Sequence, residues 1–147
     1  MTTAVFPGSF NPFTTGHKWV ADRALEIFGQ LIIAVGYNES KGIPDDLESR
    51  VETIRKLYRD DSRVKTLAYT GLTATLAKDE NALYIVRGVR NTTDFEYEKT
   101  MADINREIGG IETIFIPTPP TLAAVSSSMV RELNHYGFDT SRFIPKD

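Results

Sequence analysis

The sequence contains no cysteine among its 147 residues. That absence excludes disulfides, thiol nucleophiles, CxxC redox pairs and cysteine-based zinc sites. There are only two histidines and no HExxH motif, so we expect no dedicated histidine metal site. Long hydrophobic runs are also missing. The longest, residues 31–35, is far shorter than the roughly 20 residues that span a bilayer, and the N-terminus lacks the basic region of a signal peptide. We therefore expect a cytoplasmic protein that does not enter a membrane.

Neither sign of charge dominates the sequence. Seventeen lysines and arginines stand against twenty aspartates and glutamates, a net charge of −3, and no block of like charge occurs. Nucleic-acid binding is therefore not expected. The apolar content of 41% is typical of a globular protein, and the length predicts one domain over residues 1–147. A domain of about 150 residues buries roughly 70% of its unfolded surface, so it needs no disulfide or metal to fold.

Short runs rich in β-branched residues alternate with longer segments of helical periodicity. Strands are expected at Thr3–Phe6, Leu31–Gly36, Val64–Ala68, Leu83–Val86 and Thr113–Ile116. Helices are expected at 17–28, 47–59 and 94–108, with a last helix starting near residue 126. This alternation predicts an α/β fold, a parallel sheet with helices on both faces. Ligands bind beyond the carboxyl ends of such strands, so functional residues are expected in the segments that follow each strand.

The helix at 94–108 carries the clearest local signals. Thr93 followed by Glu96 fits a capping box, and Gly109-Gly110 is typical of a helix C-terminus. The residues at helical spacing that we expect to face the core are Tyr97, Met101, Ile104 and Ile108.

The segment after the first strand, FPGSFNPFTTGH at 6–17, is rich in glycine, proline and hydroxyl residues. Gly8 can let the backbone approach a ligand, and Thr14 or Thr15 can cap the helix that carries His17. A helix N-terminus presents free N–H groups that suit phosphate, and Ser9 and His17 add donors. The alternative is a capped helix start with a surface histidine. The segment has neither a Walker A motif nor a GxGxxG fingerprint.

Cations follow the second and fourth strands. Lys41 lies in the polar segment 36–42, and Arg87 and Arg90 flank Gly88 just past an apolar strand. Guanidinium groups bind phosphate oxygens bidentately and stay charged. The alternatives are a solvated lysine, and surface arginines that pair with Glu96 or Glu98.

Ser126, Ser127 and Ser128 stand at the expected start of the last helix. Successive hydroxyls and free N–H groups favour a second anion site, although an N-cap needs only one serine. No GxSxG elbow surrounds them, which argues against a serine nucleophile. Together the strand ends predict polyphosphate chemistry by positioning and charge stabilisation in one cleft.

These motifs in this order resemble a known family. TTGH at 14–17 matches the T/HxGH motif of the nucleotidyltransferase superfamily, and VSSSMVRE at 125–132 resembles its ISSTxxR-type segment. With NESKG and RGVRNTTDFEYE between them, the chain resembles bacterial phosphopantetheine adenylyltransferases from about residue 4 to residue 143. The resemblance implies a Rossmann-like nucleotidyltransferase fold with five parallel strands in the order 3-2-1-4-5.

The resemblance also implies a reaction of coenzyme A biosynthesis. ATP and 4′-phosphopantetheine would give dephospho-coenzyme A and pyrophosphate by in-line attack, with Mg²⁺ carried by ATP and with no protein ligand to the metal or covalent intermediate. His17 would stabilise charge at the α-phosphate in the transition state. Ser9 and Lys41 would hold the incoming phosphate. Arg87 would contact the acceptor or ATP phosphates, and Arg90 the β- and γ-phosphates.

Further positions are carried over from the family motifs as expectations. Those expected to bind ATP are Ser9, Phe10, Gly16, His17, Gly88, Arg90, Tyr97, Glu98, Ser126, Ser127 and Ser128. Those expected to bind phosphopantetheine are Ser9, Lys41, Leu72, Thr73, Arg87, Asn105 and Glu132. The family also implies a homohexamer, a dimer of trimers, and feedback binding of coenzyme A.

The sequence departs from the family pattern at several places. Asn11 replaces a common Asp, Gly71 a frequent Asp and Thr73 a frequent Met or Val, while Leu122 stands near a position that is often aromatic. Relatives are expected to continue into one more helix beyond Asp147.

Two other readings stay open. One is a sister enzyme that acts on nicotinamide mononucleotide or is a cytidylyltransferase, although the cytidylyl signature RTxGIST is absent. The other is a non-catalytic module that binds a nucleotide or coenzyme A.

Overall fold

The structure is a computed structural model that describes residues 2–147. Five parallel strands form one sheet in the order β3-β2-β1-β4-β5, which confirms the predicted fold class and strand order. The strands are β1 (Thr3–Gly8), β2 (Gln30–Gly36), β3 (Val64–Tyr69), β4 (Tyr84–Val89) and β5 (Glu112–Pro117). The chain runs outward from β1 to β3 and then returns to β4. The carboxyl ends of β1 and β4 therefore flank the switch point at which such sheets bind ligands.

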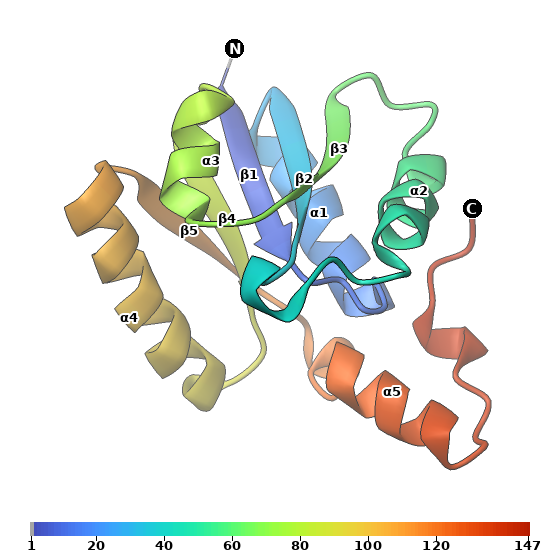
Figure 1. Ribbon diagram of the computed structural model, residues 1–147. Helices are drawn as coiled ribbons and strands as arrows, with labels where there is room; N and C mark the ends of the chain where they lie inside the picture. Colours follow the sequence, from blue (N-terminus) through green and yellow to red (C-terminus); the bar gives the residue numbers. More distant parts are fainter. Residues whose placement is uncertain (1) are drawn as a thin grey trace.

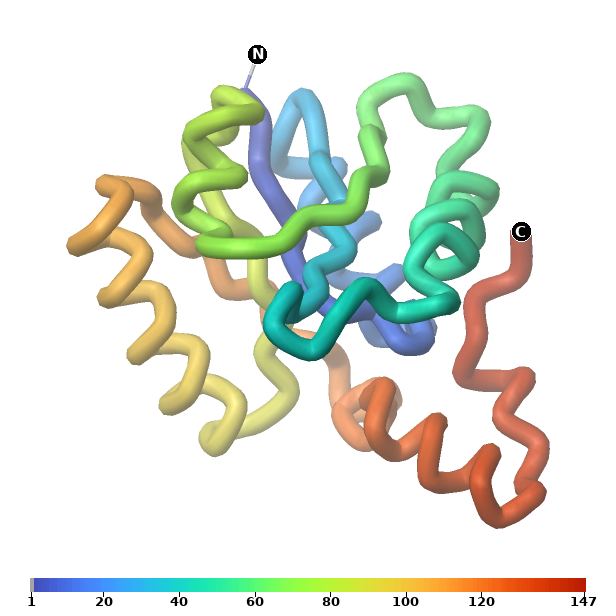
Figure 2. The backbone as a smooth tube through the Cα atoms, viewed as in Figure 1, coloured from blue at the N-terminus to red at the C-terminus, as the bar shows by residue number. Residues whose placement is uncertain are grey.

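The helices form a layer on each face of the sheet (Figure 1). Helices α1 (Thr15–Ile27) and α2 (Leu47–Leu57) pack on one face, and α3 (Thr73–Asp79) and α4 (Thr92–Gly109) lie on the other. Helix α5 (Ser127–His135) extends beyond the carboxyl edge of the sheet, and the chain then turns back toward α2 (Figure 2). Short 3-10 turns occupy Glu39–Lys41, Pro120–Leu122 and Ser141–Phe143. Within residues 2–147 no helix is long and apolar enough to cross a membrane.

The two faces of the sheet are packed unequally. Side chains alternate along a strand, so Leu31, Ile33 and Val35 of β2 join a large apolar cluster with α1 and α2. Ile32 and Ala34 point the other way, into a smaller cluster with residues of α3. The face beneath α4 therefore retains room for a cavity.

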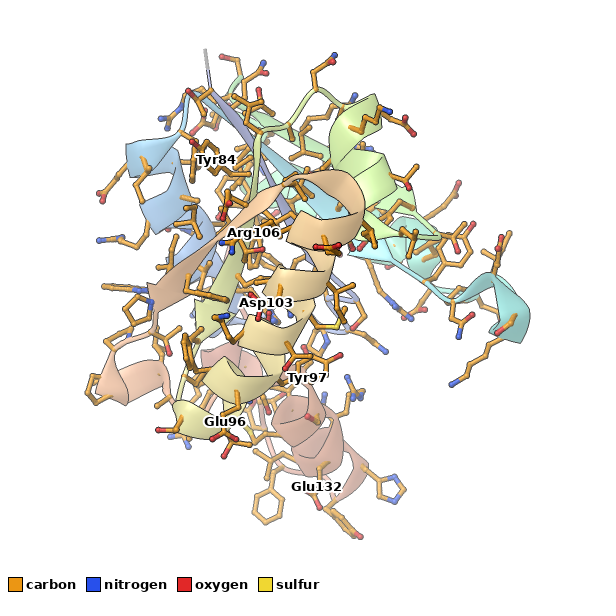
Figure 3. All side chains as sticks on the ribbon, turned by 90° about the vertical axis from the view of Figure 1, so that its left-hand side faces the viewer. Tyr84, Glu96, Tyr97, Asp103, Arg106 and Glu132 are labelled. Carbon is orange, nitrogen blue, oxygen red and sulfur yellow. The ribbon has the colours of Figure 1, made fainter. Side chains whose placement is uncertain are left out.

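Helix α4 turns its polar side toward the sheet, which contradicts the predicted core face. Glu98 is its only buried residue, and Asp94, Ala102 and Asn105 are half-buried on the same side. The four apolar residues expected in the core are exposed, Tyr97 by 65%. Figure 3 views α4 face on, with Tyr97 toward its N-terminal end. The helical period was predicted correctly, but the face was inverted because α4 lines a polar cavity.

One further local prediction is wrong, and one helix was not predicted. Asn91, not Thr93, caps α4, because its Oδ1 accepts a hydrogen bond of 2.9 Å from the Asp94 N–H. Helix α3 was not predicted, since its seven residues are too few to show a period and its N-cap, Leu72, makes no side-chain cap. The predicted glycine stop is confirmed. Gly110 takes the left-handed conformation, with φ of 63°, that ends α4.

Candidate active site

Two adjoining cavities open at the carboxyl ends of β1 and β4. The first, of about 530 Å³, lies under α4, and the second, of about 320 Å³, lies beside the N-termini of α1 and α5. The residues that line both are Pro7, Gly8, Ser9, Arg87 and Glu98. The single cleft expected from the sequence is therefore a pair of pockets that meet at Ser9 and Arg87.

His17 is held in one orientation by the start of α1. The backbone N–H of Thr14 donates to His17 Nδ1 at 2.9 Å, while the His17 N–H donates to Thr14 Oγ1 at 3.3 Å. This is a capping box in which histidine takes the usual place of glutamate or glutamine. Because Nδ1 accepts a hydrogen bond, the ring proton of neutral His17 resides on Nε2. That N–H remains for a ligand in the second pocket, which His17 lines.

The surroundings of His17 keep its ring neutral. Phe13 stacks on it with ring centroids 5.5 Å apart, and Phe10 meets it edge-on at 5.0 Å. Burial, together with the positive charges of Arg87 and Arg90, lowers the pKa of His17 from 6.5 to about 4. At neutral pH His17 is therefore a hydrogen-bond donor without charge.

The lowered pKa of His17 predicts a loss of stability in mild acid. As the pH falls from about 6.5 to about 4, the unfolded chain binds a proton at His17 that the folded chain does not bind. The free energy of unfolding should therefore fall over this window, by up to about 3 kcal/mol from this residue. Urea denaturation at pH 7 and pH 4.5 measures the loss. His17→Gln can keep the capping box but has no imidazole to titrate, so its loss of unfolding free energy should be smaller by up to about 3 kcal/mol. An equal loss in the wild type and in His17→Gln would contradict the lowered pKa of His17.

Arg87 forms the wall between the two pockets. Its Nε and Nη2 donate to the two carboxylate oxygens of Glu98 at 2.7 and 2.8 Å, and its Nη1 donates to the carbonyl of Pro7. Burial opposes the charge of Arg87, but the hydrogen bonds and negative charge of Glu98 outweigh it, so the pKa of Arg87 is raised. The guanidinium is thus fixed as a planar cation at the junction of the pockets.

Arg90 is held in a similar way at the far side of the second pocket. Its Nε and Nη2 donate to the Asp94 carboxylate at 2.8 and 3.1 Å, and its backbone N–H donates to the same group. Burial raises the pKa of Asp94, but these hydrogen bonds and the charge of Arg90 overcome that effect and lower it. Arg87 pairs with Glu98, as the alternative interpretation expected, whereas Arg90 pairs with Asp94, which it did not name. Both arginines also line the cavities.

The serines at the start of α5 have different hydrogen-bonding roles. Ser126 is the N-cap, since its Oγ accepts from the Met129 N–H at 3.1 Å, and its own hydroxyl proton remains free. Ser127 Oγ donates to the carbonyl of Pro12 at 2.7 Å and so fixes α5 to the loop after β1. Both line the second pocket, whereas the exposed Ser128 lines neither.

The structure brings most of the predicted site residues to the two pockets. Those that line the second are Ser9, Phe10, Gly16, His17, Arg87, Gly88, Arg90, Glu98, Ser126 and Ser127. Those that line the first are Ser9, Thr73, Arg87, Tyr97, Glu98 and Asn105. Those that line neither are Lys41, Leu72, Ser128 and Glu132. Tyr97, expected at the ATP site, thus lines the pocket under α4.

Several lining residues were missed in the sequence. Tyr37 and Tyr69 line the first pocket, Asp94 and Thr118 the second. Tyr37 and Tyr69 each directly follow a predicted strand, so their positions at the carboxyl edge of the sheet were the available signal. Thr118 carries a buried hydroxyl without a hydrogen-bond partner among the described residues, and no sequence pattern marks it.

Comparisons with known proteins agree with this geometry. Residues 5–133 match the family described as cytidylyltransferase-like. The curated proteins named phosphopantetheine adenylyltransferase from Bacteroides thetaiotaomicron and Bacteroides fragilis are each 50% identical over 146 residues, which are 99% of this chain and 97% of theirs. This chain belongs to the phosphopantetheine adenylyltransferase family.

For these two members of the phosphopantetheine adenylyltransferase family, the expectation of one more helix is wrong, because the aligned region covers 97% of their length. Solved structures of much lower sequence identity share the fold. Two structures of a bifunctional NMN adenylyltransferase/ADP ribose pyrophosphatase from Francisella tularensis, one complexed with AMP and a manganese ion, have TM-scores of 0.70 and 0.68 at 16% identity. They match 97% and 99% of this chain but only 44% and 45% of their own.

Proposed function

We infer that this chain transfers the adenylyl group of ATP to 4′-phosphopantetheine, which gives dephospho-coenzyme A and pyrophosphate. Family membership supports the reaction. The structural observation that supports it is the pair of pockets that meet at Ser9 and Arg87, with His17 in one of them. Two substrates placed in adjoining pockets bring their reacting phosphates together without a covalent intermediate.

In the mechanism we propose, ATP occupies the second pocket and phosphopantetheine the first. A phosphate oxygen of the acceptor attacks the α-phosphorus of ATP in line, and the bond from that phosphorus to the oxygen bridging to the β-phosphate breaks. His17 donates its Nε2–H to an α-phosphate oxygen as charge builds there, and Arg87 holds the acceptor phosphate with Ser9. Arg90 and the N-terminus of α5 hold the β- and γ-phosphates. The attacking phosphate is already an anion, so no general base is needed.

Magnesium enters this proposal with ATP. The carboxylates that line the second pocket, Asp94 and Glu98, are each paired with an arginine. Residues 2–147 contain no group of three or more potential metal-ligating side chains. We propose that the magnesium–ATP complex is the substrate.

A direct assay tests the reaction. The purified protein is incubated with ATP, Mg²⁺ and phosphopantetheine, while pyrophosphate is followed and dephospho-coenzyme A is sought by mass spectrometry. We expect stoichiometric formation of both products. Product only with CTP or with nicotinamide mononucleotide would establish the sister activity instead, and ATP binding without pyrophosphate release would establish a binding module.

Lys41 provides a test of where the acceptor binds. Its side chain is exposed in the turn Glu39–Lys41, while Asn38 and Glu39 of the same segment line the first pocket. Lys41→Ala should raise KM for phosphopantetheine or lower kcat about 10–10²-fold, because a charged hydrogen bond to phosphate is worth roughly 1.5–3 kcal/mol. KM for ATP should change less than about twofold. Steady-state kinetics with each substrate varied measures both, and a selective loss of ATP affinity would place ATP at this loop.

We also propose that the chain assembles into a hexamer in the cytoplasm and binds coenzyme A as a feedback ligand. The exposed apolar stripe of α4, formed by Tyr97, Met101, Ile104 and Ile108, supports self-association, since a second copy would remove it from water. Light scattering should give about 99 kDa, six times the chain mass of 16.5 kDa. A monomer mass would overturn the hexamer.

The proposed feedback ligand has its own test. Coenzyme A contains the pantetheine arm, so it should compete with phosphopantetheine. Inhibition kinetics with phosphopantetheine varied measures this competition.

A further inference from the structure

The turn that follows β1 holds a buried residue in a left-handed backbone conformation. Phe10 has a φ of 45°, which residues with a Cβ rarely adopt. Its ring is only 3% exposed and packs against His17 with ring centroids 5.0 Å apart. Ser9, the preceding residue, is exposed where the two pockets meet. The conformation of this turn therefore sets the positions of both Ser9 and the ring that contacts His17.

The carbonyl groups on either side of Phe10 both accept hydrogen bonds from arginines. Arg50 Nη1 donates to the Ser9 carbonyl at 3.3 Å, and Arg131 Nη1 donates to the Asn11 carbonyl at 2.6 Å. Arg50 belongs to α2 and Arg131 to α5, and the turn lies between these two helices (Figure 1). A strained backbone conformation persists only where surrounding contacts hold it, and these two contacts act directly on the strained residue's neighbours.

Arg50 is itself held in one orientation. Its Nε and Nη2 donate to the two carboxylate oxygens of Asp46 at 3.0 and 2.7 Å, which fixes the plane of the guanidinium and leaves Nη1 for the Ser9 carbonyl. The hydrogen bonds from Arg50 lower the pKa of Asp46, so this carboxylate stays ionised. The side chain of Arg50 is 13% exposed, yet it lines neither pocket. Any effect of Arg50 on a bound ligand must therefore pass through the turn.

An ion pair within a helix need not serve a site, and α2 contains a comparable pair that does not. Arg55 donates to Glu52 at 2.8 Å and to the Thr66 carbonyl of β3 at 3.2 Å. None of these three residues lines a pocket. The two arginines thus share a helix, a carboxylate partner and a backbone acceptor, and differ in whether that acceptor belongs to the site.

We propose that Arg50 is a positioning residue that holds the turn Ser9–Asn11, and so keeps Ser9 at the junction of the pockets and Phe10 against His17. Its effect on the reaction rests on the proposed function, in which Ser9 and His17 contact the reacting phosphates. Without the Nη1 donor the turn can relax toward a commoner φ, which displaces Ser9 and loosens the packing around His17. A small displacement of groups that orient the reactants lowers the rate strongly.

Kinetics on matched variants test the proposal. Arg50→Ala should lower kcat about 10–10²-fold, with KM for ATP and for phosphopantetheine within about threefold of wild type, since no ligand contact is removed. Asp46→Ala leaves the arginine in place without its anchor and should lower kcat about 3–10-fold. Asp46 makes no side-chain cap to α2, so this variant removes no helix cap. Arg55→Ala is the control and should keep kcat within about twofold of wild type.

NMR of the His17 imidazole measures the turn without any substrate. In Arg50→Ala the pKa of His17 should rise from about 4 toward 6.5, because a loosened Phe10 lets water reach the ring, while Arg87 and Arg90 remain. In Arg55→Ala it should stay near 4. The signals of His135, at the end of α5, serve as an internal control and should not move.

Either an unchanged kcat or an unchanged His17 pKa in Arg50→Ala would overturn the proposal. Equal changes in Arg55→Ala would overturn it as well, because they would show a general loosening of α2. If Arg50→Ala fails to fold, Asp46→Ala decides by the same two measurements. If the wild type forms no dephospho-coenzyme A, the proposed function is overturned, and the His17 pKa alone then decides whether Arg50 holds the turn.

Discussion

Replacing His17 by alanine should lower kcat about 10²–10³-fold, the loss expected when one preorganised donor to developing charge is removed. The neutral ring offers Nε2–H to the second pocket because Nδ1 accepts from the Thr14 N–H. KM for both substrates should change little, since this donor acts mainly in the transition state. Steady-state kinetics with each substrate varied measures these constants.

The capping role of His17 requires a second variant as a control. His17→Ala also removes half of the capping box and should destabilise the protein by about 1 kcal/mol. His17→Gln can keep the box and should restore most of the stability while kcat stays low. If thermal unfolding and activity fell and recovered together in the two variants, His17 would be a helix cap and not a catalytic residue.

Arg87→Ala should impair both substrates at once. The guanidinium lines both pockets, so its removal takes away the proposed phosphate ligand and leaves the Glu98 carboxylate, only 8% exposed, without its partner. We expect kcat/KM to fall at least about 10²-fold for ATP and for phosphopantetheine. The free energy of unfolding should fall by about 2–3 kcal/mol, less than for a fully buried pair because Arg87 is partly exposed.

The double variant Arg87→Ala/Glu98→Ala separates the two effects. Removal of the stranded carboxylate should recover much of the lost stability, because the cost of an unpaired buried charge disappears. Activity should stay low, since the phosphate ligand is still missing. Urea denaturation and kinetics on the single and double variants measure this. Recovery of activity in the double variant would show that Arg87 only neutralises Glu98.

The parallel sheet and the phosphate-directed residues at its carboxyl edge could be predicted from the sequence, whereas the order of the strands came only from the resemblance to the family. The strands are short and β-branched, the motifs follow them directly, and parallel topology brings their ends together. That logic placed Ser9, His17, Arg87 and Arg90 at the pockets. The end of a strand does not fix the direction of side chains further along the chain. Lys41, in the turn Glu39–Lys41, and Glu132, in helix α5, line neither cavity.

The errors have physical causes in particular residues. Periodicity identifies the faces of α4 but not which one contacts the sheet, and here Glu98 faces inward because Arg87 compensates its charge. Tyr69 was missed because Thr73, which hydrogen-bonds its hydroxyl, and Gly36, against which its ring packs, meet it only in the folded chain. The histidine capping box was visible as TxxH, the spacing of a capping box with an unusual third member.

On the proposed placement of ATP and phosphopantetheine, the shared wall between the pockets links the binding of the two substrates thermodynamically. A phosphate that binds Arg87 from one side must compete with Glu98 and the Pro7 carbonyl, and so alters the charge that faces the other pocket. By reciprocity, whatever factor ATP imposes on the affinity for the acceptor, the acceptor imposes on the affinity for ATP. Through the charge of Arg87, a ligand in either pocket would thus change the affinity of the other pocket, without any movement of the sheet.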